Sequence, residues 1–304
     1  MSTRVVHGLV GLALLSSQSA ARSTDALPNR LPPIENASPV VSPDGRHIAF
    51  SSTRDGRDEI YVMSGDGSSV KRLTNEPSQK GIAGWSADGR RLFYSVVDHD
   101  TSTVYSVDVG GGVASRLAIV PGVGARLTHD GSRILYGELP WQSMQLFIAK
   151  LDGSERMRLT PGTSAFYCAA FSPDDRRVAV SRQSSELWIL DADGGEGAPV
   201  APPFPGDGRP QCPSWSGDGR RIAVQANATD PVNPSKPTGS SHLWMFDTVA
   251  RSWSRLGEHA SPYLDEVPSW FPDGTRLAFQ SNRTGSMQIW VMNADETGAR
   301  QLTK

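Results

Sequence analysis

The side chains best suited to binding or to acid–base chemistry fall in separate stretches of this sequence. A histidine, a tyrosine and two carboxylates share one short segment near the C-terminal end, and a tryptophan and an arginine lie upstream. Aromatic side chains supply much contact area, and a histidine beside carboxylates could act as a general acid or base. The candidate binding residues are Arg126, Trp141, His259, Tyr263, Asp265 and Glu266.

No catalytic or metal-binding motif accompanies these candidates. The segment Gly84–Asp88 comes near to a Gly-x-Ser-x-Gly elbow but is one copy of a repeated turn. His99, His242 and His259 lie far apart in the sequence, and Asp191–Gly194 lacks the later acidic ligand of a calcium loop. We therefore predict no catalytic residue, no metal and no other cofactor.

A repeat must position the candidate residues. A turn of the type Ser-Pro-Asp-Gly, followed by a short apolar run, recurs along the chain, and Ser42–Phe50 is a clear copy. The spacings between the turn aspartates are 44, 42, 44, 44 and 55 residues. The turn aspartates are Asp44, Asp88, Asp130, Asp174, Asp218 and Asp273. A period of this size predicts a six-bladed β-propeller made of four-stranded antiparallel blades.

Each repeat divides into four short strands, which we name a to d. Strand a ends at the turn, where proline presets the first angle and glycine accepts a positive φ. Strand b is apolar on both faces, strand c carries one aromatic residue, and strand d is short. Strand a also carries an aromatic residue that recurs by blade, which favours packing between blades over a ligand platform. These residues are Trp85, Phe171, Trp215 and Trp270.

The strand order divides the connections between two faces. The short a–b and c–d turns share a regular face, and the b–c and d–a connections share the opposite face, here called the loop face. We expect irregular loops there, including about Ala226–Ser241 and Gly195–Gln211. Because variable loops on a rigid scaffold usually carry binding residues, we predict that this face binds a partner through Tyr263 and Trp141.

Strand a should also line a central tunnel. The residues four places before each turn aspartate are Val40, Gly84, Arg126, Ala170, Ser214 and Ser269. Five of them are small or aliphatic, and Arg126 is the exception. Arg126 could bind an anion in the tunnel or pair with Asp265 or Glu266, and we favour the pairing because buried charges are normally paired.

Cys168 and Cys212 occupy equivalent places, each six residues before a turn aspartate. They therefore lie in register on neighbouring inner strands. Two states stay open at this point. In an oxidising compartment they could form a disulfide, or they could be buried thiols if their Cα atoms lie beyond the ~7 Å that a bridge can span.

The bulk composition of this chain is that of an ordinary soluble protein, and the pattern of its first residues predicts export. The chain has 304 residues, 38% of them apolar, and a formal net charge of −2, which provides no field for binding nucleic acid. Residues 1–21 have the pattern of a cleaved signal peptide, with Arg4 before an apolar run and small residues at Ser19 and Ala21. We predict a linker over 22–37, the propeller over 38–304, no transmembrane span in the mature chain, and a periplasmic or secreted location.

The repeats resemble those of the TolB β-propeller family. The resemblance rests on Gln288–Asp295 with Gln301–Thr303, and on Glu59–Met63 with Lys71–Thr74, and it extends over about residues 38–304. It implies a six-bladed propeller that is commonly periplasmic. TolB also carries an N-terminal α/β domain, for which we expect no room here, so the resemblance does not carry over its contacts with the Pal lipoprotein.

We predict an exported, non-catalytic propeller that binds a protein or a cell-envelope component through the loop face. A propeller is a platform, and its function comes from the site that it carries. The alternative is a hydrolase or lyase that acts on a small or carbohydrate substrate at the mouth of the tunnel. The sequence does not predict the identity of the partner or the oligomeric state.

Overall fold

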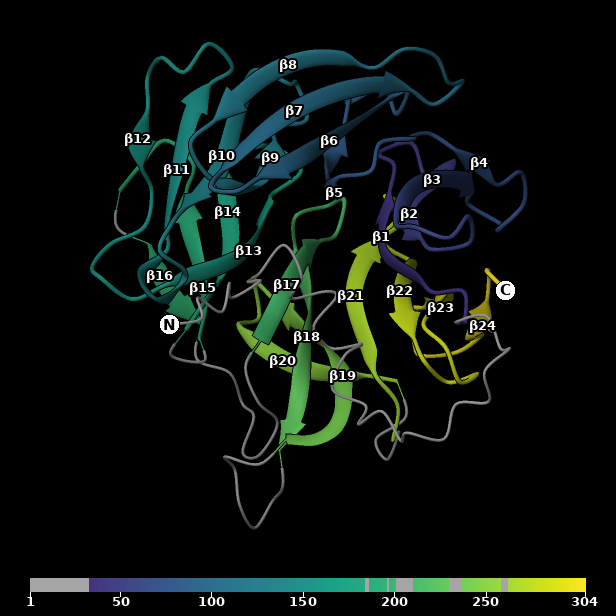
Figure 1. Ribbon diagram of the computed structural model, residues 1–304. Helices are drawn as coiled ribbons and strands as arrows, with labels where there is room; N and C mark the ends of the chain where they lie inside the picture. Colours follow the sequence, from purple (N-terminus) through teal and green to yellow (C-terminus); the bar gives the residue numbers. More distant parts are fainter. Residues whose placement is uncertain (1–32, 184–185, 196, 201–209, 230–236, 258–261) are drawn as a thin grey trace, which may run out of the picture.

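The computed structural model describes residues 33–304, except 184–185, 196, 201–209, 230–236 and 258–261. Its strands form six four-stranded antiparallel sheets, each made of four consecutive strands, around a common axis (Figure 1). The six-bladed propeller that the repeat predicts is confirmed. The predicted signal peptide lies outside the described residues, and no helix within them is long and apolar enough to cross a membrane.

Strands a to d of each blade follow one another in the sequence, and strand a is innermost. Blade one contains β1 (Asn36–Val41), β2 (His47–Ser52), β3 (Glu59–Ser64) and β4 (Lys71–Arg72). Blade two contains β5 (Gln79–Trp85), β6 (Arg91–Asp98), β7 (Thr101–Asp108) and β8 (Ser115–Val120). Blade three contains β9 (Val123–Leu127), β10 (Arg133–Glu138), β11 (Gln145–Lys150) and β12 (Met157–Arg158).

The second half of the ring repeats this arrangement. Blade four contains β13 (Phe166–Phe171), β14 (Arg177–Arg182), β15 (Glu186–Asp191) and β16 (Ala198–Val200). Blade five contains β17 (Pro210–Trp215), β18 (Arg221–Thr229), β19 (Pro237–Asp247) and β20 (Ser252–Leu256). Blade six contains β21 (Asp265–Trp270), β22 (Arg276–Ser281), β23 (Gln288–Asn293) and β24 (Arg300–Gln301).

The repeated turn holds itself together through its own side chains. The Ser42 hydroxyl donates to Oδ1 of Asp44 at 2.6 Å, and the same carboxylate oxygen accepts the amide of Arg46 at 3.0 Å. Gly45 takes a φ of 70°, which an L side chain rarely adopts. The local sequence alone therefore specifies the hairpin between strands a and b.

Each inner strand is interrupted by a β-bulge on its way to the turn. In five blades the residue six places before the turn aspartate has a φ between 45° and 67°, and in blade two the irregularity falls at Gly84. The five residues are Ser38, Gly124, Cys168, Cys212 and Val267. A bulge bends the strand and redirects a side chain, so it controls what faces the axis.

The aromatic residues of strand a pack between blades, as predicted. The indole N–H of Trp85 donates to the carbonyl of Val40 in blade one at 3.0 Å, and that of Trp215 donates to Ala170 in blade four at 3.2 Å. The guanidinium of Arg177 lies over the Trp215 ring, 4.7 Å from its centroid. These contacts join blade two to blade one and blade five to blade four, which gives the recurring aromatic residue a structural role.

The ring closes between β1 and blade six without exchanging a strand. The amide of Asn36 donates to the carbonyl of Met287 at 2.8 Å, and the amide of Ser38 donates to the side-chain oxygen of Gln280 at 2.8 Å. Phe271 of blade six packs with Phe50 of blade one in a shared hydrophobic cluster. Side-chain packing and hydrogen bonds between the first and last blades therefore complete the propeller.

The prediction of a loop over Ala226–Ser241 is wrong for both ends of that range, because the chain forms strands there. β18 continues to Thr229, β19 begins at Pro237, and the two pair as a long hairpin that extends from blade five (Figure 1). Pro237 is the first residue of its strand, a position that tolerates a missing N–H. Most of the second predicted loop, Gly195–Gln211, lies outside the described residues.

Candidate functional site

The six inner strands enclose a central cavity of about 590 Å³. Its lining contains four complete rings of residues, at fixed distances before the turn aspartates, and one of them is the ring of interblade residues Val41, Trp85, Leu127, Phe171, Trp215 and Trp270. The ring next to the regular face is Pro43, Ala87, His129, Pro173, Gly217 and Pro272. The middle ring is Val40, Gly84, Arg126, Ala170, Ser214 and Ser269, as the sequence predicts. The bulge ring is Ser38, Ile82, Gly124, Cys168, Cys212 and Val267.

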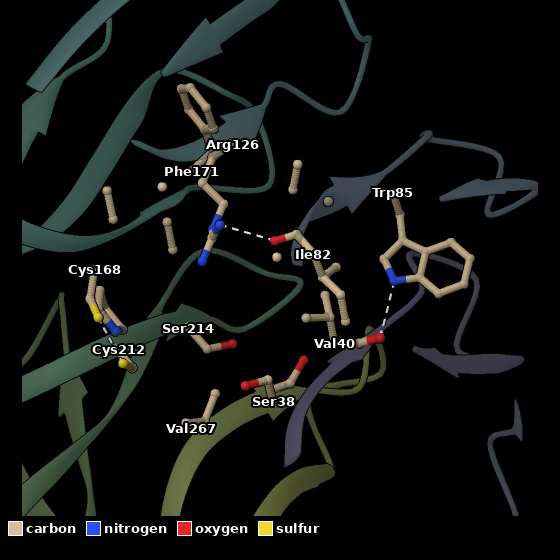
Figure 2. A pocket seen from close by; sticks show the side chains of 18 of the residues that line it. Ser38, Val40, Ile82, Trp85, Arg126, Cys168, Phe171, Cys212, Ser214 and Val267 are labelled. Carbon is tan, nitrogen blue, oxygen red and sulfur yellow. Dashed lines mark hydrogen bonds between the residues drawn. The ribbon is translucent and has the colours of Figure 1, made fainter. Parts of the chain in front are cut away.

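Arg126 is the cation of the middle ring. Its side chain extends from β9 into the cavity, and Nη1 donates to the carbonyls of Ile82 and Ala125, each at 3.0 Å (Figure 2). Within the described ranges Arg126 forms no ion pair with a carboxylate, and its burial lowers the pKa of the guanidinium. It stays charged, because an arginine pKa lies far above neutral pH. The cavity therefore contains a cation that hydrogen bonds to neutral carbonyl groups.

The favoured pairing of Arg126 with Asp265 or Glu266 is wrong. Asp265 binds Arg283 at 2.6 Å, and Glu266 accepts a hydrogen bond from Gln280 at 3.0 Å. Both carboxylates stand at the start of β21, in the blade opposite Arg126, and three or four residues farther from the turn than the middle ring. Three residues of strand span about 10 Å along the axis. Both carboxylates are also buried, so they are not surface-binding residues.

The loop-face end of the cavity carries a second group of charges. Asp58 and Lys80 both line the cavity, and Lys80 Nζ lies 3.3 Å from Oε2 of the fully buried Glu59. Burial raises the pKa of Asp58 to about 6, although the charge of Lys80 and a hydrogen bond with Ser51 act against this. Asp58 therefore titrates close to physiological pH and changes the charge of the cavity as it does so.

Sequence reasoning overlooked Asp58 and Lys80. Glu59 belongs to blade one and Lys80 to blade two, so their contact crosses a blade boundary that the repeat pattern does not describe. One signal was available. The equivalent positions in blades three and six are Gln145 and Gln288, so a glutamate at this place indicates a nearby cation.

The predicted aromatic residues do not form one patch. Trp141 begins the short 3₁₀ helix η2 (Trp141–Ser143) and lines the cavity, where its carbonyl accepts a hydrogen bond from the Tyr167 hydroxyl at 2.8 Å. Tyr263 is 39% exposed and is absent from the cavity lining. His259 lies outside the described residues. The structure thus brings Trp141 and Arg126 to one cavity and leaves Tyr263 apart.

Other candidate histidine and acidic residues make contacts that stabilise the blades and their turns. His129 Nδ1 lies 2.7 Å from Oδ1 of Asp175 in the next blade. Asp191–Gly194 is a turn, in which Oδ1 of Asp191 accepts the amide of Asp193 at 2.9 Å. Among the described residues, no three His, Cys, Asp or Glu side chains gather in a way that could hold a metal ion.

Two sequence profiles cover the chain. The profile of the tricorn protease N-terminal beta propeller domain matches residues 21–145, and that of the TolB beta propeller domain matches residues 138–304. A tricorn protease homolog of Streptomyces coelicolor is 28% identical over an alignment of 216 residues, and the match covers 52% of this chain and 20% of that protein. The Tol-Pal system protein TolB of Anaeromyxobacter is 35% identical over 66 residues, 22% of this chain and 14% of that protein. The chain therefore spans a small part of the length of these two relatives.

Solved structures share the fold. TolB from Acinetobacter baumannii superposes with a TM-score of 0.66 and 15% identity, over 89% of this chain and 63% of that chain. An oligogalacturonate lyase from Vibrio parahaemolyticus superposes with a TM-score of 0.61 and 15% identity, over 87% and 92%. At this identity the likeness concerns the fold alone. The profile that matches more than half of the sequence nevertheless assigns the family, and this chain belongs to the TolB beta-propeller domain family.

Proposed function

We propose that this protein is an exported, non-catalytic binding propeller that takes an acidic segment of a protein or cell-envelope component into its central cavity. The observation that carries the proposal is Arg126. Its guanidinium faces a cavity of about 590 Å³ and forms no ion pair within the described part of the chain. A buried cation without a counter-ion is costly, so a ligand carboxylate would remove that cost.

The size and composition of the cavity support a binding role. Its volume falls within the range of about 300–1,000 Å³ that is usual for ligand pockets, which place a few polar groups in a largely apolar wall. Here the middle ring places one arginine among small residues, with Ser214 and Ser269 on the opposite side of the ring. Trp141 adds an aromatic surface towards the loop face. A cavity whose middle ring holds one cation among uncharged residues suits a chain that carries a carboxylate.

The comparisons support an exported scaffold without choosing its ligand. The family includes a Tol-Pal system protein, which is consistent with a role at the cell envelope. The same fold occurs in a protein named as a tricorn protease homolog and in an oligogalacturonate lyase. Since one fold can host unrelated functions, an enzyme with its site at the cavity mouth is the alternative.

Four variants of the mature protein test this proposal in pull-downs from an envelope extract. Arg126→Met and Trp141→Ala alter the cavity, and Tyr263→Ala alters the loop face outside it. Arg46→Met removes an exposed charge from the regular face, where the side chain is 81% accessible. We expect the two cavity variants to lose at least tenfold in capture and Arg46→Met to capture normally, with thermal melts confirming that all four fold.

Two results would contradict the proposal. If Tyr263→Ala alone loses capture, the ligand binds the outer loop face and not the cavity. If wild type and all variants capture equally, neither surface is the binding site. Direct titration with a short glutamate-containing peptide and its glutamine counterpart then identifies the chemistry, since only the acidic peptide should depend on Arg126.

A further inference from the structure

The two cysteines of the chain face each other in the wall of the central cavity. Cys168 of β13 and Cys212 of β17 belong to neighbouring blades, and their Sγ atoms lie 2.8 Å apart (Figure 2). Both residues are free cysteines, partly accessible from the cavity that they line. The sulfur atoms are already within contact distance, and they must approach by less than about 1 Å more to reach the length of a disulfide bond.

The positive φ that Cys168 and Cys212 share with the equivalent residues of other blades does not explain why these two positions hold cysteine. Cys168 and Cys212 take positive φ values of 45° and 48°, which are uncommon for residues other than glycine. The equivalent positions hold Ser38, Gly124 and Val267, also with positive φ. The bulge is therefore a property of the blade and does not require cysteine. What distinguishes blades four and five is that the bulge directs two thiols towards one another.

The surroundings make the two thiols chemically unequal. The pKa of the Cys168 thiol is lowered, mainly by its side-chain hydrogen bond with Cys212, with further help from the charge of Arg126 and the backbone amide of Cys212. The pKa of Cys212 is raised by the same hydrogen bond and by burial. Cys168 is thus the partner that carries thiolate character, and the thiolate is the nucleophile in disulfide exchange.

We propose that Cys168 and Cys212 form a redox-active dithiol in the cavity wall, which closes to a disulfide between blades four and five. The oxidant is a small disulfide that enters the cavity. The Cys168 thiolate attacks one sulfur of that disulfide, the S–S bond breaks, and one thiolate leaves and takes up a proton. Cys212 loses its proton and attacks Sγ of Cys168, which releases the second thiol. Two protein thiols are oxidised, and one external disulfide is reduced to two thiols.

The thiol reaction takes place in the same cavity as the proposed capture of a ligand, but it does not depend on that capture. It requires only the two cysteines and access for a small reagent, so its test does not depend on any partner. The expected environment is an oxidising compartment, where such bonds persist. The disulfide would tie two inner strands that are otherwise linked by packing and by the indole hydrogen bond of Trp215.

The test uses hydroxyethyl disulfide, a small neutral probe, on the reduced and folded full-length mature protein. After quenching and unfolding, remaining thiols are alkylated with a maleimide and counted by mass spectrometry. We expect wild type to lose both alkylatable thiols, to become lighter by two hydrogens, and to recover both thiols after dithiothreitol. If both thiols remain alkylatable after prolonged incubation, or if only adducts on single cysteines accumulate, the proposal is overturned.

Single variants test the order of the two steps. Cys212→Ser should trap the mixed disulfide on Cys168. Cys168→Ser should form its adduct on Cys212 more slowly at neutral pH, because burial and the charge of Glu266 still raise the pKa of Cys212 and leave less thiolate. Equal rates for the two variants would overturn the assignment of Cys168 as the attacking thiol. If either variant fails to fold, thiol counting on the wild type still decides whether the pair closes.

Discussion

Replacing Glu59 by glutamine should weaken the junction between blades one and two. Glu59 is fully buried, and its Oε1 accepts from Arg57 Nε at 2.6 Å and from Arg72 Nη2 at 3.1 Å. Its Oε2 accepts the Thr74 hydroxyl at 2.6 Å and lies 3.3 Å from Lys80 Nζ. The Lys80 side chain is only 1% accessible. The substitution keeps the shape of Glu59 but removes the charge that balances Lys80.

The size of the stability loss depends on the interactions that Lys80 keeps in the Glu59→Gln variant. Removing one partner of a buried ion pair costs about 3–5 kcal/mol. Lys80 keeps hydrogen bonds to the carbonyls of Glu76 and Ser78, and the carboxylate of Asp58 is close enough for electrostatic interaction. We therefore expect the Glu59→Gln change to lower the free energy of unfolding by about 3 kcal/mol, the low end of that range.

A double-mutant cycle separates the ion pair from simple packing. Lys80→Met leaves Glu59 with two arginines and should cost about 1 kcal/mol. The double variant removes both charges of the Lys80–Glu59 pair and has a glutamine at this place, as blades three and six do, where Thr160 donates to Gln145 at 2.7 Å and Thr303 donates to Gln288 at 2.8 Å. It should therefore be more stable than Glu59→Gln alone, with a coupling energy of about 1–2 kcal/mol.

Urea unfolding followed by tryptophan fluorescence measures these differences. The matched control is Glu155→Gln, which removes an exposed carboxylate that pairs with Lys150 and should change stability by less than about 0.5 kcal/mol. If Glu59→Gln is as mild as this control, or if the two single changes add without coupling, the buried ion pair does not stabilise the junction and the reasoning fails.

Two further predictions concern pH. The pKa of Asp58 in the folded state is about 6, raised by burial above its unfolded value. The folded state therefore binds this proton more tightly, and the stability from Asp58 is lost as pH rises from about 4 to about 6. Urea midpoints of wild type and Asp58→Asn should differ in their pH dependence over that interval, and parallel curves would refute this. The pKa of Asp130 is lowered by hydrogen bonds from the Thr128 hydroxyl and the Ser132 amide. Its contribution is present above about pH 4 and is lost as pH falls, so Asp130→Asn should be less stable than wild type at neutral pH and converge with it in acid, as thermal melts can show.

The fold could be predicted from the sequence because its information is local. The hairpin at Ser42–Gly45 is specified by four consecutive residues, and it recurs at a nearly constant interval. The apolar run after each turn identifies strand b, which in turn fixes strand a as its neighbour. Counting back from the turn was then enough to place all six residues of the middle ring, including Arg126.

The charge partners could not be predicted in the same way. The ion pairs Lys80–Glu59 and Arg283–Asp265 depend on distances across blades or between strands, and neither follows from the position within one repeat. The bulges added a second difficulty. An extra residue in a strand changes which side chains face the axis beyond it, and nothing in the residue types at Ser38 or Val267 indicates a positive φ.

In a closed array of similar blades, the positions where one blade departs from the others carry the functional information. The blades share the turns, the interblade aromatic residues and the bulges, which are requirements of the scaffold. Arg126 departs from a ring of small residues, and Cys168 and Cys212 depart from a ring of serine, glycine and aliphatic residues. All three departures face one cavity from blades three, four and five. Arg126 also donates to a carbonyl of blade two, but neither this arginine nor the two adjacent thiols belongs to the features that all blades share, and their convergence on one side of the cavity supports both proposals.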